Sequence, residues 1–284
     1  MGNSISMRSY FITGGSGFIG REIVRQLLAK DDTEHIVCLT RGKRTDYLSH
    51  PKLSFWHGDI TDCIFPIEEF TDVIHGACDA NDLHYQDSKD IYYTSIEGTA
   101  RVLQFIENIG ANAIILSSGA AVRNTVYGRA KRICETLAGH EVKIARIFSV
   151  IGEEMPLNGQ FAAGKFIWEA MNKGCVTLYG GQSERTYLHV SDCARWILNI
   201  LDNGDSGVPY DVAGNESVSI NTLALNISDI WCAPISRIDG PDRCDKYEPD
   251  LTLATGIGCK QTINLRNALK LIHDHYAHLR HPNQ

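Results

Sequence analysis

The feature that most constrains the fold is a glycine-rich segment near the start of the sequence, TGGSGFIG at residues 13–20. It follows a short apolar run over residues 9–13, which predicts a buried strand. It also opens a segment over residues 18–30 whose apolar residues recur at helical spacing. Glycines allow a sharp turn and let the helix pack closely on the strand. The sequence therefore predicts a strand, a tight glycine turn and a helix, in this order.

Predicted strands and helices go on alternating along the first half of the chain. Further strands are expected over residues 35–40, 53–57, 72–77, 113–116 and 142–148, and helices over 88–109 and 127–137. This alternation is typical of an α/β fold with a doubly wound parallel sheet of the Rossmann type.

The pattern loosens after residue 152, where short elements are mixed with polar loops. We therefore expect a sheet domain formed by residues 8–152 and 185–214. A smaller C-terminal lobe, interwoven with this domain, is expected from residues 153–184 and 215–284.

Charge, cysteine content and hydropathy exclude several classes of protein. The net charge of −7 argues against a nucleic-acid binder, whose affinity comes largely from cations that neutralise phosphates. The nine cysteines include no C-x-x-C pair, so neither a disulfide framework nor a metal site is expected. No apolar run approaches the roughly 18 residues of a membrane-spanning helix. We therefore expect a cytoplasmic protein with reduced thiols and no membrane partner.

The glycine segment also carries a G-x-G-x-x-G pattern at Gly15, Gly17 and Gly20. Between a strand and a helix, this pattern brings the backbone close to a pyrophosphate, which the N–H groups at the helix start can bind. The sequence therefore predicts a dinucleotide site. Its cofactor-binding residues are expected to include Gly14, Gly17, Phe18, Ile19 and Gly20.

The residues after the second predicted strand indicate which dinucleotide binds. A carboxylate at this position would bind the ribose 2′-hydroxyl of NAD. The chain instead has three cations there, Arg41, Lys43 and Arg44. A guanidinium matches a 2′-phosphate, so Arg41 predicts NADP(H), with NAD(H) left open.

A second set of residues suits proton transfer. Tyr127 and Lys131 are four positions apart, which places them on one face of the predicted helix. An ammonium beside a phenol is expected to lower the pKa of the phenol towards neutral pH. Such a tyrosine can exchange a proton with a substrate oxygen while a hydride moves at the carbon. Ser117 and Ser118 directly follow the predicted strand 113–116, and a hydroxyl at this point could hydrogen-bond the same oxygen.

As a set, these motifs resemble the extended short-chain dehydrogenases/reductases, the family of NAD(P)-dependent epimerases, dehydratases and reductases that act on nucleotide sugars. The resemblance extends over nearly the whole chain. It rests on TGGSGFIG at 13–20, HGDITD at 57–62, VIHGA at 73–77, IEGT at 96–99, ILSSGAAV at 115–122, YGRAK at 127–131, ARIFSVIG at 145–152 and ERTYLHVSD at 184–192.

The resemblance implies further roles in cofactor binding and catalysis. Tyr127 is the acid or base, and Lys131 also holds the nicotinamide ribose. Asp59 and Ile60 flank the adenine, and Ala77 contacts the cofactor. On this basis the sheet domain is the NADP-binding domain.

The resemblance also implies where the substrate binds. Arg185 would grip the diphosphate of a nucleotide sugar, because its planar donors match phosphate oxygens. Ser149 is a second expected substrate contact. The C-terminal lobe is then the substrate-binding lobe.

Three departures from the family pattern bear on the reaction. Gly119 stands where the family usually has Ser or Thr, so Ser118 is the expected replacement hydroxyl. Ser95 and Ser149 stand where Asn is frequent. Only nine positions separate Ser118 from Tyr127, a short loop that resembles those of 4-keto-sugar reductases.

The resemblance thus implies an NADPH-dependent reductase of a nucleotide-activated keto sugar, of the 4-keto-6-deoxyhexose type. One alternative is a nucleotide-sugar epimerase with tightly bound NAD(P). The other is a non-catalytic regulator that senses NADP. A homodimer is left open.

Overall fold

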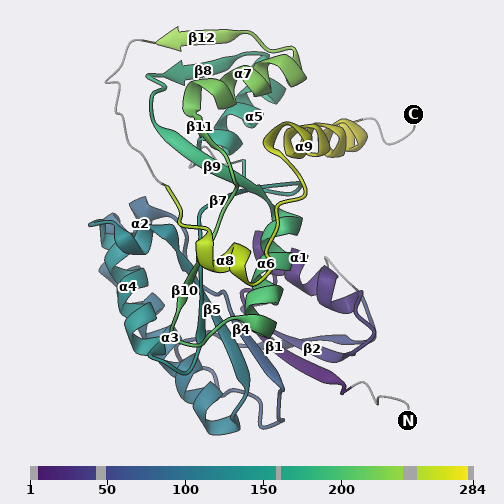
Figure 1. Ribbon diagram of the computed structural model, residues 1–284, viewed down its shortest axis with the longest axis vertical. Coiled ribbons are helices and arrows are strands. Elements are labelled where there is room, and N and C mark those ends of the chain that lie inside the picture. Colours follow the sequence, from purple (N-terminus) through teal and green to yellow (C-terminus); the bar gives the residue numbers. More distant parts are fainter. Residues whose placement is uncertain (1–5, 43–48, 158–160, 239–247, 281–284) are drawn as a thin grey trace. The chain divides into compact units, whose positions relative to one another are not determined.

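The computed structural model describes residues 6–42, 49–157, 161–238 and 248–280, and it divides the chain into two compact units (Figure 1). Unit 1 comprises Met1–Ile147, Ala194–Asp211 and Thr252–Cys259, and unit 2 comprises Phe148–Cys193, Val212–Leu251 and Lys260–Gln284. Each unit is therefore assembled from three segments that are separated in the sequence.

Unit 1 is built on a seven-stranded sheet with the strand order β10-β6-β5-β4-β1-β2-β3. Its strands are β1 (Arg8–Thr13), β2 (Thr33–Thr40), β3 (Leu53–His57), β4 (Asp72–His75), β5 (Asn112–Ser118), β6 (Lys143–Ile147) and β10 (Pro209–Val212). Neighbouring strands from β3 to β6 run parallel, and the strand order reverses direction between β1 and β4. This topology confirms the predicted α/β fold with a doubly wound parallel sheet of the Rossmann type.

Helices cover both faces of this sheet (Figure 1). Helices α1 (Phe18–Leu28) and α6 (Val190–Asn203) lie on one face, and α3 (Lys89–Ile109) and α4 (Val126–Ala138) lie on the other. The shorter helices are α2 (Asp82–Asp87), η1 (Gly119–Val122) and α8 (Thr252–Gly256). In sheets of this kind, ligands bind outside the carboxyl ends of the strands, at the point where the strand order reverses.

An aromatic cluster holds the sheet against α3. Phe11 of β1 is fully buried, and its ring centroid lies 5.2 Å from that of Phe105 and 5.3 Å from that of Phe70. Phe65 contacts the same ring edge-on, at 5.9 Å. Burying each such side chain contributes about 1.5–3 kcal/mol. The cluster thereby fixes β1, and with it the start of the glycine turn.

Unit 2 contains two small sheets. One has the order β11-β9-β7 and the other pairs β12 with β8. Their strands are β7 (Ser149–Ile151), β8 (Val176–Tyr179), β9 (Glu184–His189), β11 (Ser217–Ser219) and β12 (Ile235–Ile238). The helices are α5 (Ala162–Lys173), α7 (Ile220–Trp231) and α9 (Leu265–Arg280).

One predicted strand is divided in the structure. The strand expected over 142–148 ends at Ile147 as β6, and the chain continues as β7 in a different sheet. At the break, the Phe148 N–H donates to the carbonyl of Val212 at 3.0 Å. Periodicity alone misses this change of partner, because both segments are apolar and extended.

Candidate active site

The glycine turn between β1 and α1 is tightly packed at two positions and open at a third. Gly14 has a φ of +77°, and a Cβ there would lie 2.6 Å from the carbonyl carbon of Gly76. A Cβ on Gly20 would lie 2.1 Å from the carbonyl oxygen of Gly14. Among the described residues, a Cβ on Gly17 would meet only that same oxygen, at 3.2 Å. The fold itself therefore requires glycine at positions 14 and 20, while space remains beside Gly17.

The start of α1 leaves donors for an anion. Gly17 is the N-cap residue, so no side chain there accepts a hydrogen bond from the first turn. The first turn also has no acidic residue. Its N–H groups and the positive end of the helix dipole favour a negatively charged group. Phe18, Ile19 and Gly20 contribute this turn, so the residues present fit the pyrophosphate of a dinucleotide.

Arg41 follows β2 and is 77% exposed. Its guanidinium lies 3.7 Å from a carboxylate oxygen of Asp59, a loose and solvent-exposed ion pair. The N–H and the hydroxyl of Thr61 donate to Asp59, at 3.1 and 2.8 Å, and these bonds hold the pKa of Asp59 below its usual value. The structure thus brings two predicted cofactor residues together. The other predicted cations, Lys43 and Arg44, lie outside the described residues.

Ile60 packs against helix α3. A Cβ on Gly98 would come within 2.8 Å of the Ile60 side chain, so a glycine is needed there. Arg101 donates to the carbonyl of Ile60 at 3.1 Å. Ile60 therefore helps to fix the segment after β3, and its predicted adenine contact stays a prediction.

A buried hydrogen-bonded chain links the ends of β1 and β4 to helix α3. The Ala77 N–H donates to the hydroxyl of Thr13 at 3.2 Å, and that hydroxyl lies 2.7 Å from Nδ1 of His75. On the other side of the ring, Nε2 lies 3.0 Å from the hydroxyl of Thr99, which donates to the carbonyl of Ser95. Because Thr99 already donates, His75 must carry its proton on Nε2 and accept from Thr13 at Nδ1.

His75 is neutral in this network. Burial lowers the pKa of His75 to about 3, and the positive charge of Lys131 acts in the same direction. Sequence reasoning used His75 only as part of the VIHGA motif. Its partner Thr13 is 62 positions away, so only the fold reveals their contact.

Helix α4 presents Tyr127 and Lys131 on one face. The helix starts at Val126 because Thr125 is its N-cap and accepts a hydrogen bond from the Gly128 N–H at 3.0 Å. Nζ of Lys131 lies 5.9 Å from the centre of the Tyr127 ring. The predicted helical spacing is therefore present in the structure.

Ser118 joins this pair from the end of β5. Its hydroxyl accepts a hydrogen bond from the Ala120 N–H at 3.2 Å, which caps the short helix η1. The same hydroxyl acts to lower the pKa of the Tyr127 phenol. Gly119, where the expected hydroxyl is missing, is buried as the first residue of η1. The structure thus brings together the three residues predicted to be catalytic.

Lys131 is nearly fully buried, with 6% of the residue exposed. Its ammonium donates to Sγ of Cys78 at 3.0 Å and to the carbonyl of Leu116 at 3.1 Å. Burial acts to lower the pKa of Lys131, but Cys78 and Tyr127 together outweigh it, and the pKa is raised above its ordinary value. Lys131 is therefore a permanent positive charge in this site.

The electrostatics of Tyr127 correct one expectation. Burial raises the pKa of Tyr127, while the charge of Lys131 and the Ser118 hydroxyl oppose this effect. The predicted influence of Lys131 is present, but a net lowering is wrong for this structure because loss of solvation is the larger effect.

Tyr85 of α2 packs beside Tyr127, and sequence reasoning missed it. The two ring centroids are 5.0 Å apart, with the ring planes at 60°. The Tyr85 hydroxyl donates to the carbonyl of Asp79 at 2.9 Å and therefore accepts from the hydroxyl of Ser95 at 2.5 Å. Tyr85 thus has no free proton for a substrate and serves as a wall of the site.

A buried ion pair fixes α4 against the sheet. Nε and a terminal nitrogen of Arg146 in β6 donate to the two carboxylate oxygens of Glu135, at 2.9 and 2.6 Å. The Ser117 hydroxyl also donates to Glu135, at 2.6 Å. Glu135 is one turn beyond Lys131, and Ser117 precedes Ser118. The pair therefore sets the distance between the two elements that carry the predicted catalytic residues.

The predicted substrate residues lie in unit 2. Arg185 is in β9 and donates to the carbonyl of Glu184 at 2.7 Å. Ser149 is in β7, directly opposite Tyr187 of β9. Because side chains alternate along a strand, Arg185 and Tyr187 share one face of β9. Ser149 is paired with Tyr187, so its side chain lies on the same face of this sheet as those of Arg185 and Tyr187.

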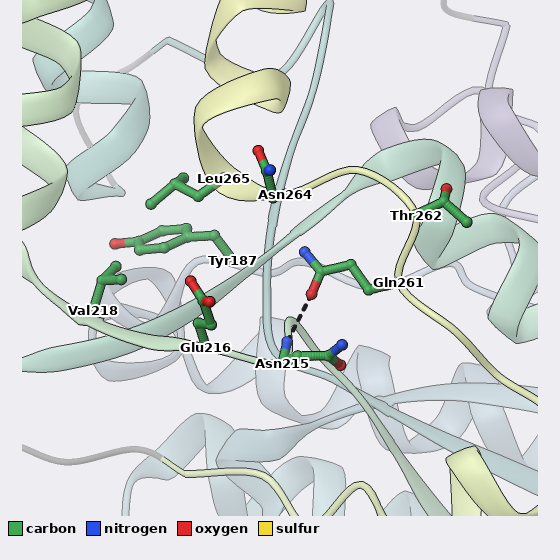
Figure 2. A pocket seen from close by; sticks show the side chains of 8 residues that line it. All are labelled: Tyr187, Asn215, Glu216, Val218, Gln261, Thr262, Asn264 and Leu265. Carbon is green, nitrogen blue, oxygen red and sulfur yellow. Dashed lines mark hydrogen bonds between the residues drawn. The ribbon is translucent and has the colours of Figure 1, made fainter.

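A pocket of about 200 Å³ opens in unit 2 (Figure 2). It is lined by Tyr187, Asn215, Glu216, Val218, Gln261, Thr262, Asn264 and Leu265. Within it, the Asn215 N–H donates to the side-chain oxygen of Gln261 at 2.8 Å. The lining is mostly polar and has no cation, so it does not suit a phosphate.

Two other kinds of site are absent from the described part of the chain. No group of three or more His, Cys, Asp or Glu side chains is arranged to hold a metal ion there. Likewise, none of the described helices is long and apolar enough to cross a membrane.

Residues 10–213 match the NAD dependent epimerase/dehydratase family, and the chain belongs to this family. The match covers the sheet, the glycine turn and the Tyr127 cluster. The chain is therefore an NAD-dependent enzyme of the extended short-chain dehydrogenase/reductase type.

A curated relative is UDP-glucuronic acid decarboxylase 2 of Arabidopsis thaliana. It is 25% identical over 92% of this chain, and the match spans 66% of the relative's own length. Among solved structures, the fold resembles UDP-glucose 4-epimerase of Thermotoga maritima with UDP-glucose, at a TM-score of 0.85 and 22% identity, covering 96% and 99% of the two chains. It also resembles a double mutant of dTDP-glucose 4,6-dehydratase from Streptomyces venezuelae with NAD bound, at a TM-score of 0.81 and 20% identity, covering 95% and 97%.

Proposed function

We propose that this chain is an NAD(P)-dependent enzyme that modifies a nucleotide-activated sugar by hydride transfer at one sugar carbon. The observation that carries the proposal is the Lys131 ammonium, which lies 5.9 Å from the centre of the Tyr127 ring on the same face of α4. This cluster lies in the same unit as the glycine turn, whose residues fit a dinucleotide pyrophosphate. The names of the relatives support a nucleotide sugar as the substrate class.

In this reaction the dinucleotide supplies the hydride acceptor or donor. Tyr127 removes the proton from a sugar hydroxyl during oxidation and returns it during reduction. Lys131 stabilises the tyrosinate through its permanent charge. Ser118 orients the reacting oxygen through the hydroxyl that also acts to lower the pKa of Tyr127.

The other predicted contacts belong to this proposal as well. The dinucleotide would be held by unit 1 residues, namely Gly14, Gly17, Phe18, Ile19, Gly20, Arg41, Asp59, Ile60, Ala77 and Lys131. The nucleotide sugar would be held by Arg185 and Ser149.

Two candidate reactions differ in whether the dinucleotide is recycled on the enzyme or consumed in each turnover. The relatives are decarboxylases, epimerases and dehydratases, which supports an enzyme that keeps its dinucleotide bound and recycles it. The second candidate is an NADPH-dependent reductase of a nucleotide 4-keto sugar. The exposed Arg41 favours it, because a cation at that position suits the 2′-phosphate of a dinucleotide that exchanges with solvent.

Mass spectrometry of the purified protein and a turnover assay test both candidates. A bound dinucleotide, together with conversion of UDP-glucose or UDP-glucuronic acid without added cofactor, would support the recycling enzyme. Oxidation of one NADPH per nucleotide 4-keto sugar would support the reductase. Tyr127→Phe is the control that must lose either activity. Absence of both activities in a protein that binds dinucleotide would refute the proposal and favour the NADP-sensing regulator.

A further inference from the structure

Cys78 lies in the loop after β4, and its side chain is exposed. Its sulfur nevertheless contacts the most buried charge of the candidate active site, because Sγ lies 3.0 Å from Nζ of Lys131. The two residues are 53 positions apart. An exposed residue therefore supplies a hydrogen-bond acceptor to the buried Lys131 ammonium.

This contact uses one of the hydrogen-bond donors of the Lys131 ammonium. A lysine ammonium has three N–H donors. One donates to the sulfur of Cys78 and a second to the carbonyl of Leu116, at 3.0 and 3.1 Å. Cys78 lies in the loop after β4, and Leu116 lies in β5. Two acceptors from two elements together fix the direction of the third N–H. That remaining donor is the one left for a dinucleotide or for Tyr127.

The chain also contains a second exposed thiol, whose hydrogen-bond partner is a carbonyl instead of a lysine. Among the cysteines that the structure describes, Cys78 and Cys232 are the exposed ones. Cys232 is the C-cap residue of α7, and its thiol lies 4.0 Å from the carbonyl of Asp229. Cys232 therefore serves as an internal reference for an exposed cysteine.

We propose that Cys78 is a positioning residue for Lys131, so that removing or blocking its sulfur weakens dinucleotide binding and proton transfer together. The role in proton transfer rests on the proposed function. The contact itself, and its effect on dinucleotide binding, are tested without any sugar substrate.

The first test compares two variants that differ by one hydroxyl. Cys78→Ser keeps an acceptor for the ammonium, whereas Cys78→Ala removes it, and neither opens a buried cavity because the side chain is exposed. Calorimetry with NADPH and NADH should show about tenfold weaker binding for Cys78→Ala, the effect of a lost charge-assisted hydrogen bond. Binding by Cys78→Ser should stay within about threefold of the wild type. Equal binding by Cys78→Ala and the wild type, or equally weak binding by both variants, would overturn the positioning role.

The second test uses the thiol itself. The Cys78 thiolate attacks methyl methanethiosulfonate, a new S–S bond forms, and methanesulfinate leaves with the electrons of the broken bond. The modified wild type should bind dinucleotide about tenfold more weakly, and dithiothreitol should restore the affinity. Cys78→Ser treated in the same way should keep its affinity. Unchanged binding after complete modification of Cys78, verified by mass spectrometry, would contradict the proposal.

The third test separates this proposal from the proposed reaction. Lys131→Met removes the ammonium that lies 3.0 Å from the sulfur of Cys78. Iodoacetamide should therefore label Cys78 at a clearly different rate in this variant than in the wild type. Cys232 should react equally in both proteins. A protein that modifies no nucleotide sugar but shows this pattern would refute only the reaction. Labelling of Cys78 that is independent of Lys131 would refute the contact, whatever the reaction.

Discussion

The Tyr127 cluster and the surface around Arg41 belong to the same unit, yet they are held in different ways. Lys131 is 6% exposed and has two hydrogen-bond acceptors, and the helix that carries it is fixed by the buried Glu135–Arg146 pair. The side chain of Arg41 is 77% exposed, and its ion pair with Asp59 is loose, at 3.7 Å. The cluster is thus defined by geometry, whereas Arg41 can act only through its charge, which salt screens. Substitutions should therefore have large effects at the first region and small, salt-dependent effects at the second.

The largest effect is expected from removal of the phenol proton. Tyr127→Phe keeps the ring against Tyr85 but loses the group that exchanges a proton with the substrate. We expect kcat to fall by about 10²–10⁴-fold, the usual contribution of general acid–base catalysis. Dinucleotide binding should be retained, because the glycine turn is unchanged. Single-turnover measurements of hydride transfer test this prediction.

Ser118→Ala provides the graded control for this variant. The loss should be smaller than in Tyr127→Phe, because water can replace one hydrogen bond to the reacting oxygen. A Tyr127→Phe enzyme with the wild-type rate would show that the proton comes from another group.

The next effect concerns the pair that holds α4. Glu135→Gln keeps the volume of the side chain but removes the charge that pairs with Arg146. Breaking a buried pair is strongly destabilising, and since Arg146 is 24% exposed at its side chain, we expect about 2–3 kcal/mol. Urea denaturation measures this loss of unfolding free energy.

The matched control is an exposed pair in unit 2. Arg266 and Asp229 form an ion pair with both side chains at least half exposed. Asp229→Asn should cost less than about 0.5 kcal/mol, because exposed pairs contribute little. Equal costs for the two variants would show that the Glu135 pair is not a structural clamp.

Local patterns explain which parts of this molecule could be predicted from the sequence. The glycine turn and the Tyr127–Lys131 spacing follow from residues that are neighbours in the chain, and the structure places them as predicted. The sheet followed from the alternation of strands and helices. Such features depend on backbone geometry over fewer than ten residues, which the sequence shows directly.

The groups that hold the cluster in place could not be predicted in this way. His75 meets Thr13, and Lys131 meets Cys78, across 62 and 53 positions. Only the parallel sheet brings the ends of these strands together. The net effect of burial on the pKa of Tyr127 also depends on packing, so a rule based on Lys131 alone gave the wrong direction.

The third prediction uses the buried histidine as a pH probe. The pKa of His75 is lowered to about 3 in the folded chain, against about 6.5 for an unfolded histidine. Below pH 6.5 the unfolded chain therefore binds a proton that the folded chain does not. Stability should fall with decreasing pH by up to about 1.4 kcal/mol per unit, until the pH approaches 3.

A comparison with His75→Asn isolates this contribution from that of the carboxylates. The variant is expected to be less stable at pH 7, because its shorter side chain cannot bridge Thr13 and Thr99. Between pH 6.5 and 5, however, the wild type should lose about 1.6 kcal/mol more than the variant does. Parallel stability curves for the two proteins over this range would show that His75 titrates normally when folded.

The smallest effect is expected at Arg41. If its charge selects the 2′-phosphate, Arg41→Ala should raise the Kd for NADPH about fivefold at low salt and leave the Kd for NADH unchanged. The difference should shrink at 0.5 M salt, because the guanidinium and its Asp59 partner are both accessible to ions. Arg41→Asp should reverse the preference, since a carboxylate repels the phosphate and can accept from a ribose hydroxyl.

Arg266→Ala, the same charge change on an exposed arginine of unit 2, is the control for nonspecific electrostatics. A fivefold loss that persists at high salt would mean that Arg41 acts through fixed geometry, as the Tyr127 cluster does, and would remove the distinction between the two regions.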